Sequence, residues 1–402
     1  MTTLTAALEE LYARAPRGIR LGVESMQNAL DRAGGVPFPI VHVAGTNGKG
    51  SVCAMVEAAL RENSVHTGMY TSPHLCRFAE RIRIDGASLP DAALTGYLRD
   101  AMRIGAELSF FEVATLAALL AFRDAKVSMA VLEVGLGGRY DATNVALDKR
   151  VTAITSIALD HQQYLGTDTA SIAAEKAGIL RASVPCVLGA LDPIARAVIA
   201  REAKLRGAPI LEAVTYPGTL SLGGAHQQGN ADVAWTITQL LGVAEDAAIR
   251  GIANAKWPGR YEWLHDARVL LDGAHNPEGV AALVASLRAE EELVYAGTLD
   301  RPPLGALVFG AMADKPAAQM LAPLHPLFPH HVYVAPSGRA PSDPYALAAE
   351  FGGSVAADVP SALAEAQRLA QGGAVVVAGS LYLVGAARAH LLGIPSDPPI
   401  AL

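Results

Sequence analysis

From residue 38 onward, short apolar runs rich in β-branched residues alternate with segments whose apolar positions repeat at helical spacing. The first of these units pairs a predicted strand at 40–44 with a glycine-containing turn at 45–50 and a helix that follows it. Further strands are expected at 129–134, 151–157 and 186–189, and helices at 111–122, 169–180, 193–206 and 226–241. This alternation predicts an α/β fold with a largely parallel sheet.

A break in the pattern divides the chain into two such regions. Pro258 and Gly259 follow a long helical stretch, which indicates a turn or linker. Beyond it the alternation restarts, with strands expected at 269–271, 306–309, 331–334 and 375–378, and helices at 277–289, 315–324, 345–351, 361–371 and at the end of the chain. We therefore expect two α/β domains, 1–257 and 261–402, joined by a linker at 258–260.

Residues 369–387 form the one uncharged run that calls for a test as a membrane span. The run contains four glycines as well as Gln371 and Ser380, whereas a spanning helix needs about 20 predominantly apolar residues. A buried strand at 374–378, a tight turn and a helix fit the pattern better, and no membrane partner is expected.

Composition narrows the function class. The chain has 402 residues, of which 51% are hydrophobic and 18% charged, so it can bury a core and is not intrinsically disordered. Its formal net charge is −7 and it carries no lysine or arginine run, which argues against a nucleic-acid partner. Three widely spaced cysteines favour a reducing cytoplasm over a disulfide scaffold, and the N-terminal residues do not resemble a signal peptide.

The strongest local signal is a glycine-rich loop between the first strand and its helix, formed by Gly45, Thr46, Asn47, Gly48, Lys49, Gly50 and Ser51. Glycines let successive backbone N–H groups point at a phosphate, while the helix N-terminus and Lys49 add positive charge. The spacing departs from the Walker A pattern because Gly50 separates the lysine from the serine. The alternative is a loop that only turns the chain, but its position between a strand and a helix favours phosphate binding.

Two further strands deliver polar residues at their ends. Glu133 lies in an apolar run, where a buried carboxylate needs a partner, and we expect Mg²⁺, with an ion pair to Arg139 as the alternative. Asp160 and His161 follow the predicted strand at 151–157 and would lie beside Glu133 if the two strands were neighbours. On its own, His161 would more often be a core histidine than a ligand, but its position at a strand end, level with Glu133, favours a ligand.

Other polar residues are less informative by themselves. Lys176 alone would fit an exposed helix face. In the second region, Asp272, His275 and Asn276 follow a predicted strand and could contact a nucleotide or an amino acid, although Asn276 suits a helix N-cap as well. Arg260 in the linker is a candidate phosphate clamp.

Taken together, the ordered motifs resemble folylpolyglutamate synthases and dihydrofolate synthases, which are members of the Mur ligase superfamily. The resemblance spans residues 42–385 and rests on HVAGTNGKGS (42–51), YTSPHL (70–75), ERIRIDG (80–86), LEVGLGGRYDATN (132–144), TSIALDHQQYLG (155–166), EKAGI (175–179), PGRYE (258–262), DGAHNP (272–277) and GSLYLVG (379–385). It implies an N-terminal P-loop ATPase domain that binds ATP, Mg²⁺ and a pterin, and a smaller Rossmann-like domain that binds glutamate.

The resemblance also implies roles for single residues. The loop at 45–51 would hold the ATP phosphates, and Asn230, Arg260, Asp272 and His275 would make further nucleotide contacts. Mg²⁺ ligands would be Ser72, Glu133 and His161, and Lys176 matches a lysine that is carbamylated in several members. Catalytic roles would fall to Lys49, Lys176, His161 and His275.

For the substrates, the resemblance implies a pterin pocket with Phe111 and Asp141, even though Ser109 replaces the usual threonine of that pocket. Arg81 is expected among the substrate contacts, and glutamate is expected near His275 and Ser380. The implied enzyme is a cytoplasmic, monomeric, ATP-dependent ligase that joins L-glutamate to dihydropteroate, to reduced folates, or to both. The alternatives are another Mur-type amino acid ligase, a P-loop kinase or NTPase, and a non-catalytic nucleotide-binding module.

Overall fold

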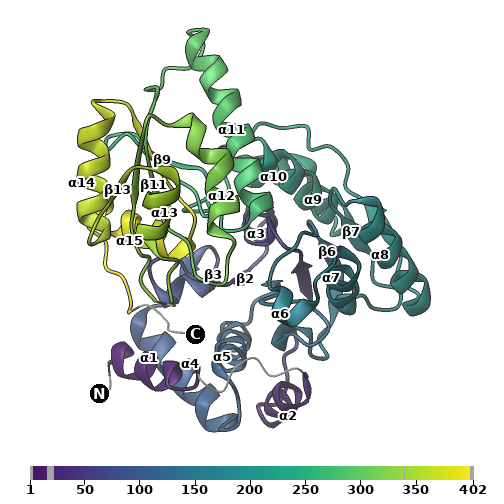
Figure 1. Cartoon of the computed structure of the whole chain (residues 1–402). Helices are drawn as coiled ribbons and strands as arrows, with labels where there is room; N and C mark the ends of the chain where they lie inside the picture. The colour runs from purple at the N-terminus through teal and green to yellow at the C-terminus, as the bar shows by residue number, and fades with distance from the viewer. Residues whose placement is uncertain (1–2, 16–21, 339, 399–402) are drawn as a thin grey trace. The chain divides into compact units, whose positions relative to one another are not determined.

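The computed structural model describes residues 3–15, 22–338 and 340–398 and divides the chain into two compact units. The first unit comprises Met1–His74, Phe78–Ser221 and Gln227–Lys256. The second comprises Trp257–Leu402 together with two short segments, Leu75–Arg77 and Leu222–His226. Figure 1 labels the helices and strands of both units.

Among the described residues, the first unit is built on an eight-stranded sheet in the order β4-β3-β2-β5-β1-β6-β7-β8. Its strands are β1 (Ile40–Ala44), β2 (Thr67–Tyr70), β3 (Ile82–Ile84), β4 (Ala87–Ser88), β5 (Met129–Glu133), β6 (Lys149–Ile154), β7 (Cys186–Leu188) and β8 (Ile210–Glu212). All neighbours are parallel except for β2 with β3 and β3 with β4. The central strand β1 is fully buried, as a strand covered by helices on both faces must be.

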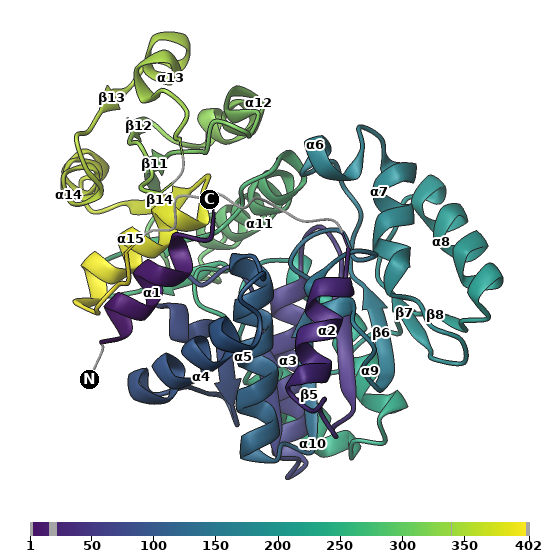
Figure 2. The same ribbon diagram turned by 90° about the horizontal axis from the view of Figure 1, so that it is seen from below.

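Helices cover both faces of this sheet (Figure 2). The helices of this unit are α1 (Leu4–Tyr12), α2 (Glu24–Arg32), α3 (Lys49–Glu62), α4 (Asp91–Ile104), α5 (Phe110–Ala125), α6 (Gln162–Leu165), α7 (Thr169–Lys176), α8 (Pro193–Arg206), α9 (His226–Leu240) and α10 (Glu245–Ala253), with short 3₁₀ turns η2 (Phe78–Arg81), η3 (Ala142–Asn144) and η4 (Ala177–Ile179). The chain steps from β1 to β2 through α3 and in the opposite direction from β6 to β7 through α7. Right-handed crossovers therefore place α3 and α7 on opposite faces.

Within the described residues, the second unit has a six-stranded sheet in the order β13-β12-β11-β14-β10-β9, parallel except for β9 with β10. Its elements are β9 (Glu262–Leu264), β10 (Val269–Leu271), α11 (Pro277–Tyr295), β11 (Leu304–Phe309), α12 (Ala317–Leu324), η5 (His325–Leu327), β12 (His330–Tyr333), α13 (Pro344–Phe351), β13 (Ser354–Val355), α14 (Val359–Ala370), β14 (Ala374–Ala378) and α15 (Leu381–Leu392). Alternate strand residues face two cores. Leu270, Phe309 and Val376 pack with α11, α12 and α13, whereas Leu271, Val308 and Val377 pack with α14 and α15.

The α/β fold class is confirmed, with two differences of detail that bear on the site. The strand expected at 151–157 ends at Ile154, and the helix expected at 169–180 ends at Lys176 and gives way to a 3₁₀ turn. The uncharged run at 369–387 forms the end of α14, a turn, β14 and the start of α15, as the sequence predicts. None of the helices in the described ranges is long and apolar enough to cross a membrane.

Candidate active site

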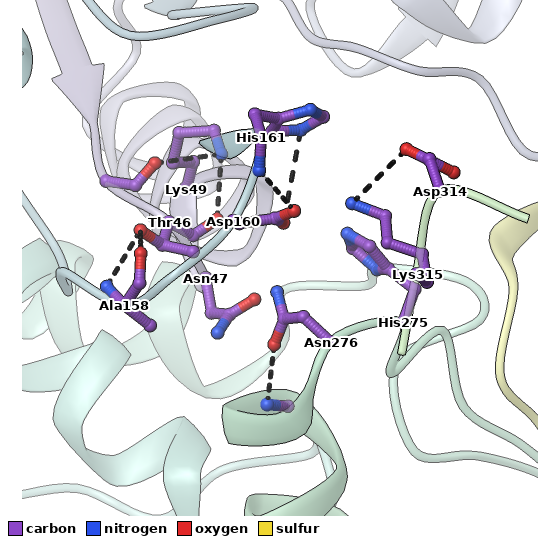
Figure 3. A network of polar contacts seen from close by, with 12 residues as sticks. Thr46, Asn47, Lys49, Ala158, Asp160, His161, His275, Asn276, Asp314 and Lys315 are labelled. Atoms are coloured by element: carbon purple, nitrogen blue, oxygen red, sulfur yellow. Dashed lines mark hydrogen bonds and ion pairs between the residues drawn. The ribbon is translucent and has the colours of Figure 1, made fainter. Parts of the chain in front are cut away.

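The glycine-rich loop lies where β1 passes into α3. Gly48 is the N-cap of α3 with φ 85°, in the left-handed region that favours glycine. A Cβ at this position would lie 2.1 Å from Asn230 Oδ1, so the loop and α9 approach each other closely. Lys49 Nζ turns back over the loop and donates to the carbonyl oxygens of Gly45 at 3.1 Å and Thr46 at 2.9 Å (Figure 3). The loop therefore places a cation at the N-terminus of a helix.

The residues after β6 hold this loop in place. Thr155 Oγ1 donates to the Asn47 carbonyl at 2.6 Å, and the Asn47 N–H donates to Ser156 Oγ at 3.0 Å. Thr46 Oγ1 accepts from the Ala158 N–H at 3.0 Å, as Figure 3 shows. The two residues that follow β6 therefore bind the loop through their side chains, while the Thr155 N–H still donates to the Ala44 carbonyl at the end of β1 at 2.9 Å. Nothing in the sequence pattern pointed to this role.

Lys176 is buried at the end of α7 and lies at the same loop. Its Nζ donates to the Gly45 carbonyl at 2.8 Å, the oxygen that Lys49 also uses. Burial, and after it the charge of Lys49, lowers the pKa of Lys176 to about 7. The exposed helix face that the sequence alone would allow is therefore wrong, and the amine has a large neutral fraction near neutral pH.

Glu133 ends β5, which lies directly beside β1. Its buried carboxylate accepts the Ser72 N–H on Oε2 at 3.0 Å, so the two predicted metal ligands are brought together. Arg139, the alternative partner, lies instead 3.4 Å from Glu175 and 3.6 Å from Glu202. A carboxylate at the carboxyl end of a parallel strand is well placed for a ligand bound over the sheet.

His161 lies on the other side of the loop, because β6 and β5 flank β1 and are not neighbours. The strands that lead to Glu133 and to His161 are therefore not adjacent, as they would have to be for the sheet to place the two residues side by side. The residue has φ 50° and its N–H donates to Asp160 Oδ1 at 2.8 Å, with the ring Nε2 3.9 Å from the other carboxylate oxygen (Figure 3). Within the described part of the chain, no three His, Cys, Asp or Glu side chains gather as a metal site.

Aromatic rings surround Arg81 in the first unit. Its buried guanidinium lies 5.2 Å from the ring centroid of Phe78 and 5.4 Å from that of Phe110, and Nε donates to His74 Nδ1 at 2.9 Å. Burial, with the Arg81 charge second, lowers the pKa of His74 well below its usual value. His74 is therefore neutral and can accept this hydrogen bond.

Phe111, one of the two predicted pterin contacts, lies in the first turn of α5. Its ring centroid lies 6.0 Å from that of Tyr70, and a Cβ on Gly135 would come within 2.3 Å of the Phe111 ring. Ser109 forms a capping box with Glu112, whose carboxylate accepts the Ser109 N–H at 2.8 Å. Ser109, which stands in place of the usual threonine, is therefore the N-cap of α5.

Asp141, the other predicted pterin contact, is buried and bonded within its own loop. Oδ2 accepts the Leu136 N–H at 2.8 Å, and Oδ1 accepts the N–H and the hydroxyl of Thr143 at 2.9 and 2.5 Å. Burial raises the pKa of Asp141, although these donors oppose the rise. The carboxylate thus shapes the loop after β5.

In the second unit, Asp272 connects the linker to the end of β10. Its Oδ2 accepts the Tyr261 N–H and its Oδ1 the Ala274 N–H, both at 2.9 Å. Burial raises the pKa of this carboxyl group, while His226 and Arg260 lie close enough to oppose the rise. Asp272 therefore fixes the backbone directly after Arg260 and the turn that follows β10.

The remaining predicted residues of this unit lie at helix starts or turns. His275 Nδ1 is 2.8 Å from the Gly273 carbonyl oxygen, and Asn276 caps α11 by accepting the Gly279 N–H at 2.8 Å (Figure 3). Ser380 is buried and caps α15 by accepting the Tyr382 N–H at 3.2 Å. The N-cap alternative for Asn276 is confirmed.

Glu262 also belongs to this unit, and its sequence position alone did not predict a role for it. Its carboxylate accepts the Gly259 N–H at 2.8 Å and pairs with Arg388 Nε at 2.9 and 3.0 Å. It holds the turn that carries Arg260 against α15. Its place in the PGRYE run was the only available signal.

Two family models of known proteins match separate parts of the chain. Residues 43–212 match the family model "Mur ligase middle domain", and residues 259–381 match "Mur ligase, glutamate ligase domain". The two matches cover the sheet with the glycine-rich loop and most of the second unit.

Individual relatives extend the similarity over most of the chain. It is 36% identical over 340 residues to the dihydrofolate synthase/folylpolyglutamate synthase of Escherichia coli, covering 78% of this chain and 77% of that protein. It is 35% identical to a probable bifunctional folylpolyglutamate synthase/dihydropteroate synthase of Haloferax volcanii, of which it spans about half (48%) while 92% of this chain is covered. The solved structure of E. coli FolC in complex with DHPP and ADP superposes with a TM-score of 0.87 at 32% identity and covers 98% of both chains.

Proposed function

Because this chain belongs to the dihydrofolate synthase/folylpolyglutamate synthase family of Mur ligases, we propose that it is an ATP-dependent ligase that joins L-glutamate to dihydropteroate, with reduced folates as a second acceptor. The observation that carries the proposal is the glycine-rich loop, where two lysines share one carbonyl oxygen. The loop follows β1, which lies between β5, ending in Glu133, and β6, followed by the loop-binding residues 155–156. Such a site suits phosphoryl transfer between anions.

The proposed reaction has two steps. A carboxylate oxygen of the acceptor attacks the γ-phosphorus of ATP, the bond to ADP breaks, and an acyl phosphate forms. The amine of glutamate then attacks the acyl carbon, and the tetrahedral intermediate releases inorganic phosphate and leaves an amide. Both steps concentrate negative charge, and the acyl phosphate must be kept from water.

The phosphates would bind at the N-terminus of α3, against the backbone N–H groups of residues 45–51. Lys49 supplies a positive charge that is already held over this loop, and Asn230 lies against Gly48 from α9. To bind phosphate, Lys49 would give up only its two hydrogen bonds to the carbonyl oxygens of Gly45 and Thr46. Phosphate oxygens would replace them with stronger, charge-assisted hydrogen bonds.

ATP and a divalent metal ion, taken as Mg²⁺, are the proposed cofactors. Ser72, Glu133 and His161 would hold the metal, and the donor chemistry fits for two of them, because a buried carboxylate fixed by a backbone N–H and a hydroxyl are hard oxygen ligands. His161 offers nitrogen, which suits Mg²⁺ less well. When bound, the ion neutralises charge on phosphate oxygens, and water and phosphate commonly complete its coordination.

For Lys176 we propose carbamylation. The reaction with CO₂ requires a neutral amine, and burial beside Lys49 supplies one by lowering the pKa of Lys176 to about 7. The adduct exchanges a buried cation for an anion. It would thus relieve the repulsion between Lys176 and Lys49 and could orient a metal ion in the site.

The proposed acceptor pocket lies in the first unit and uses Phe111 as a stacking surface for the flat pterin ring. Arg81, held by His74 and by two aromatic rings, supplies a positive charge for the acceptor. Asp141 would accept hydrogen bonds from the pterin, in addition to those of its own loop. Residues 1–257 would therefore carry the ATP, metal and pterin sites.

Residues 261–402 would carry the glutamate site, with His275 and Ser380 near the amino acid. Arg260, in the linker at 258–260, would contact the nucleotide directly. Asp272 would act indirectly, by holding the backbone next to Arg260. We further propose that the enzyme works as a monomer in the cytoplasm. Its few, widely spaced cysteines suit a reducing compartment.

A coupled ADP-release assay tests the proposal. Dihydropteroate and tetrahydrofolate are compared side by side, each with and without L-glutamate. We expect ADP release only when acceptor and glutamate are both present, with dihydropteroate the faster acceptor. ADP release with a muramyl acceptor and not with either pterin would leave the ligase class and overturn the folate assignment, whereas release that ignores glutamate would indicate a kinase or NTPase.

A further inference from the structure

His42 is a fully buried histidine in the centre of β1, two residues before the strand ends. The other residues of this strand are apolar and fill the layers between sheet and helices. Its Nε2 lies 2.7 Å from Thr143 Oγ1 in the loop after β5. The contact joins residues 101 positions apart in the chain, and the proposed mechanism makes no use of it.

The direction of the hydrogen bonds follows from counting protons. Thr143 has a single hydroxyl proton, and it is donated to Asp141 Oδ1 at 2.5 Å. The hydroxyl must therefore accept from His42, so Nε2 of His42 carries the proton. Burial, with the cations Lys149 and Arg181 as lesser causes, lowers the pKa of His42 well below its usual value, so the ring is neutral.

This tautomer leaves Nδ1 as a lone pair, and Nδ1 has no hydrogen-bond partner in the part of the chain that the structure describes. A buried acceptor without a partner is unfavourable, and a leucine or valine would fill a central strand without that cost. The hydrogen bond that His42 donates to Thr143 therefore explains why a histidine occupies this position.

The far end of the chain of hydrogen bonds meets the proposed acceptor pocket. Asp141 Oδ2 accepts the Leu136 N–H at 2.8 Å and so fixes the backbone of residues 135–136. Gly135 lies so close to the Phe111 ring that a Cβ would come within 2.3 Å of it. The series His42, Thr143, Asp141 and Leu136 thus connects the central strand to the wall behind Phe111.

We propose that His42 is a positioning residue for the acceptor: through Thr143 it orients the Asp141 carboxylate and holds the 135–136 loop against Phe111. This inference rests on the proposed function, because it assigns the loop to the pterin side of the site. It concerns a side chain that would not touch substrate. It predicts an effect on acceptor binding that does not extend to ATP.

Two matched pairs of variants test the proposal. His42→Gln keeps an N–H donor at about the reach of Nε2, whereas His42→Leu removes it. Thr143→Ser keeps the hydroxyl, whereas Thr143→Val removes it at equal volume. We expect His42→Leu and Thr143→Val to raise the KM for dihydropteroate roughly tenfold, the change that follows the loss of an ordinary buried hydrogen bond. The KM for ATP should stay within about twofold, and Gln and Ser should restore most of the acceptor affinity.

The possible outcomes distinguish a failure of the positioning role of His42 from a failure of the proposed function. Equal changes in both KM values, or a Gln variant as impaired as the Leu variant at equal Tm, overturn the positioning role. If His42→Leu does not fold, the Thr143 pair decides by the same criteria. A native enzyme whose ADP release dihydropteroate does not stimulate contradicts the proposed function itself, whereas an active native enzyme with an unchanged acceptor KM in Thr143→Val contradicts only this inference.

Discussion

Lys49 and Lys176 donate hydrogen bonds to the same carbonyl oxygen, that of Gly45, at 3.1 and 2.8 Å. Two ammonium groups that share one acceptor repel each other, and Lys176 is buried as well. The protein tolerates this arrangement because Lys176 can lose its proton, whereas Lys49 lies at the loop where an anion is expected. The pair therefore links phosphate binding to the chemical state of a second lysine.

The first prediction concerns pH and stability. The pKa of Lys176 falls from its ordinary 10.5 in the unfolded chain to about 7 in the folded protein, so between these values the unfolded chain binds one more proton. The contribution of this group to the free energy of unfolding therefore rises with pH from about 7 to 10, by at most about 1.4 kcal/mol per pH unit. Urea titrations in CO₂-free buffer should show this rise as a difference between the native protein and Lys176→Met. A difference that is flat or falls with pH contradicts it.

The second prediction concerns the proposed adduct. With ¹³C-labelled bicarbonate, the native enzyme should give a carbamate signal by ¹³C NMR, and Lys176→Met should lack it. Lys204, which lies on the exposed part of α8, serves as the matched control, since its replacement by methionine should leave the signal unchanged. Loss of the signal on lowering the pH below about 7 is expected, because the amine then stays protonated. A native spectrum without the signal would rule out the modification.

The third prediction concerns the loop lysine. Lys49→Ala should lower turnover by about 10²–10³-fold, the effect of removing one charge contact from a transition state. The variant should still fold, because Lys49 is only partly buried and its side chain donates to the carbonyl oxygens of Gly45 and Thr46 in its own loop. Circular dichroism and Tm provide the control. Near-native turnover in a folded variant would show that the loop does not act on phosphate.

The fourth prediction concerns Phe111. Its replacement by alanine should raise the KM for dihydropteroate by about 2–10-fold through the loss of ring stacking, with a larger effect if buried area is lost as well. The KM for ATP should not change. Phe111→Tyr keeps the ring and should behave like the native enzyme. An acceptor KM that is insensitive to Phe111→Ala would place the pterin elsewhere.

The sequence predicts the elements whose pattern is set by local burial. The strand at 40–44, the loop at 45–50 and the helix that follows appear as expected, because both faces of β1 are covered and α3 is buried from Ser51 to Leu60. The end of β6 is different. Thr155 and Ser156 lie just beyond Ile154 and bind Asn47 through their side chains, and such a tertiary contact leaves no periodic signal.

The site shows the same limit. Motifs place Glu133 and Ser72 near each other, and the structure joins them by a hydrogen bond. The state of Lys176 depends on burial and on a charge 127 residues away, which no local pattern contains. The capping box of Ser109 with Glu112 could have been found, since a serine three residues before a glutamate at the start of an apolar run is a known N-terminal signal.

The most direct test of the central claim, an acyl-phosphate ligase, follows an oxygen atom. Dihydropteroate labelled with ¹⁸O in its carboxylate is turned over with ATP and L-glutamate, and the phosphate and the product are analysed by mass spectrometry. We expect one ¹⁸O atom in each inorganic phosphate released and one retained in the amide carbonyl. Phosphate without label, formed together with ADP, would contradict it.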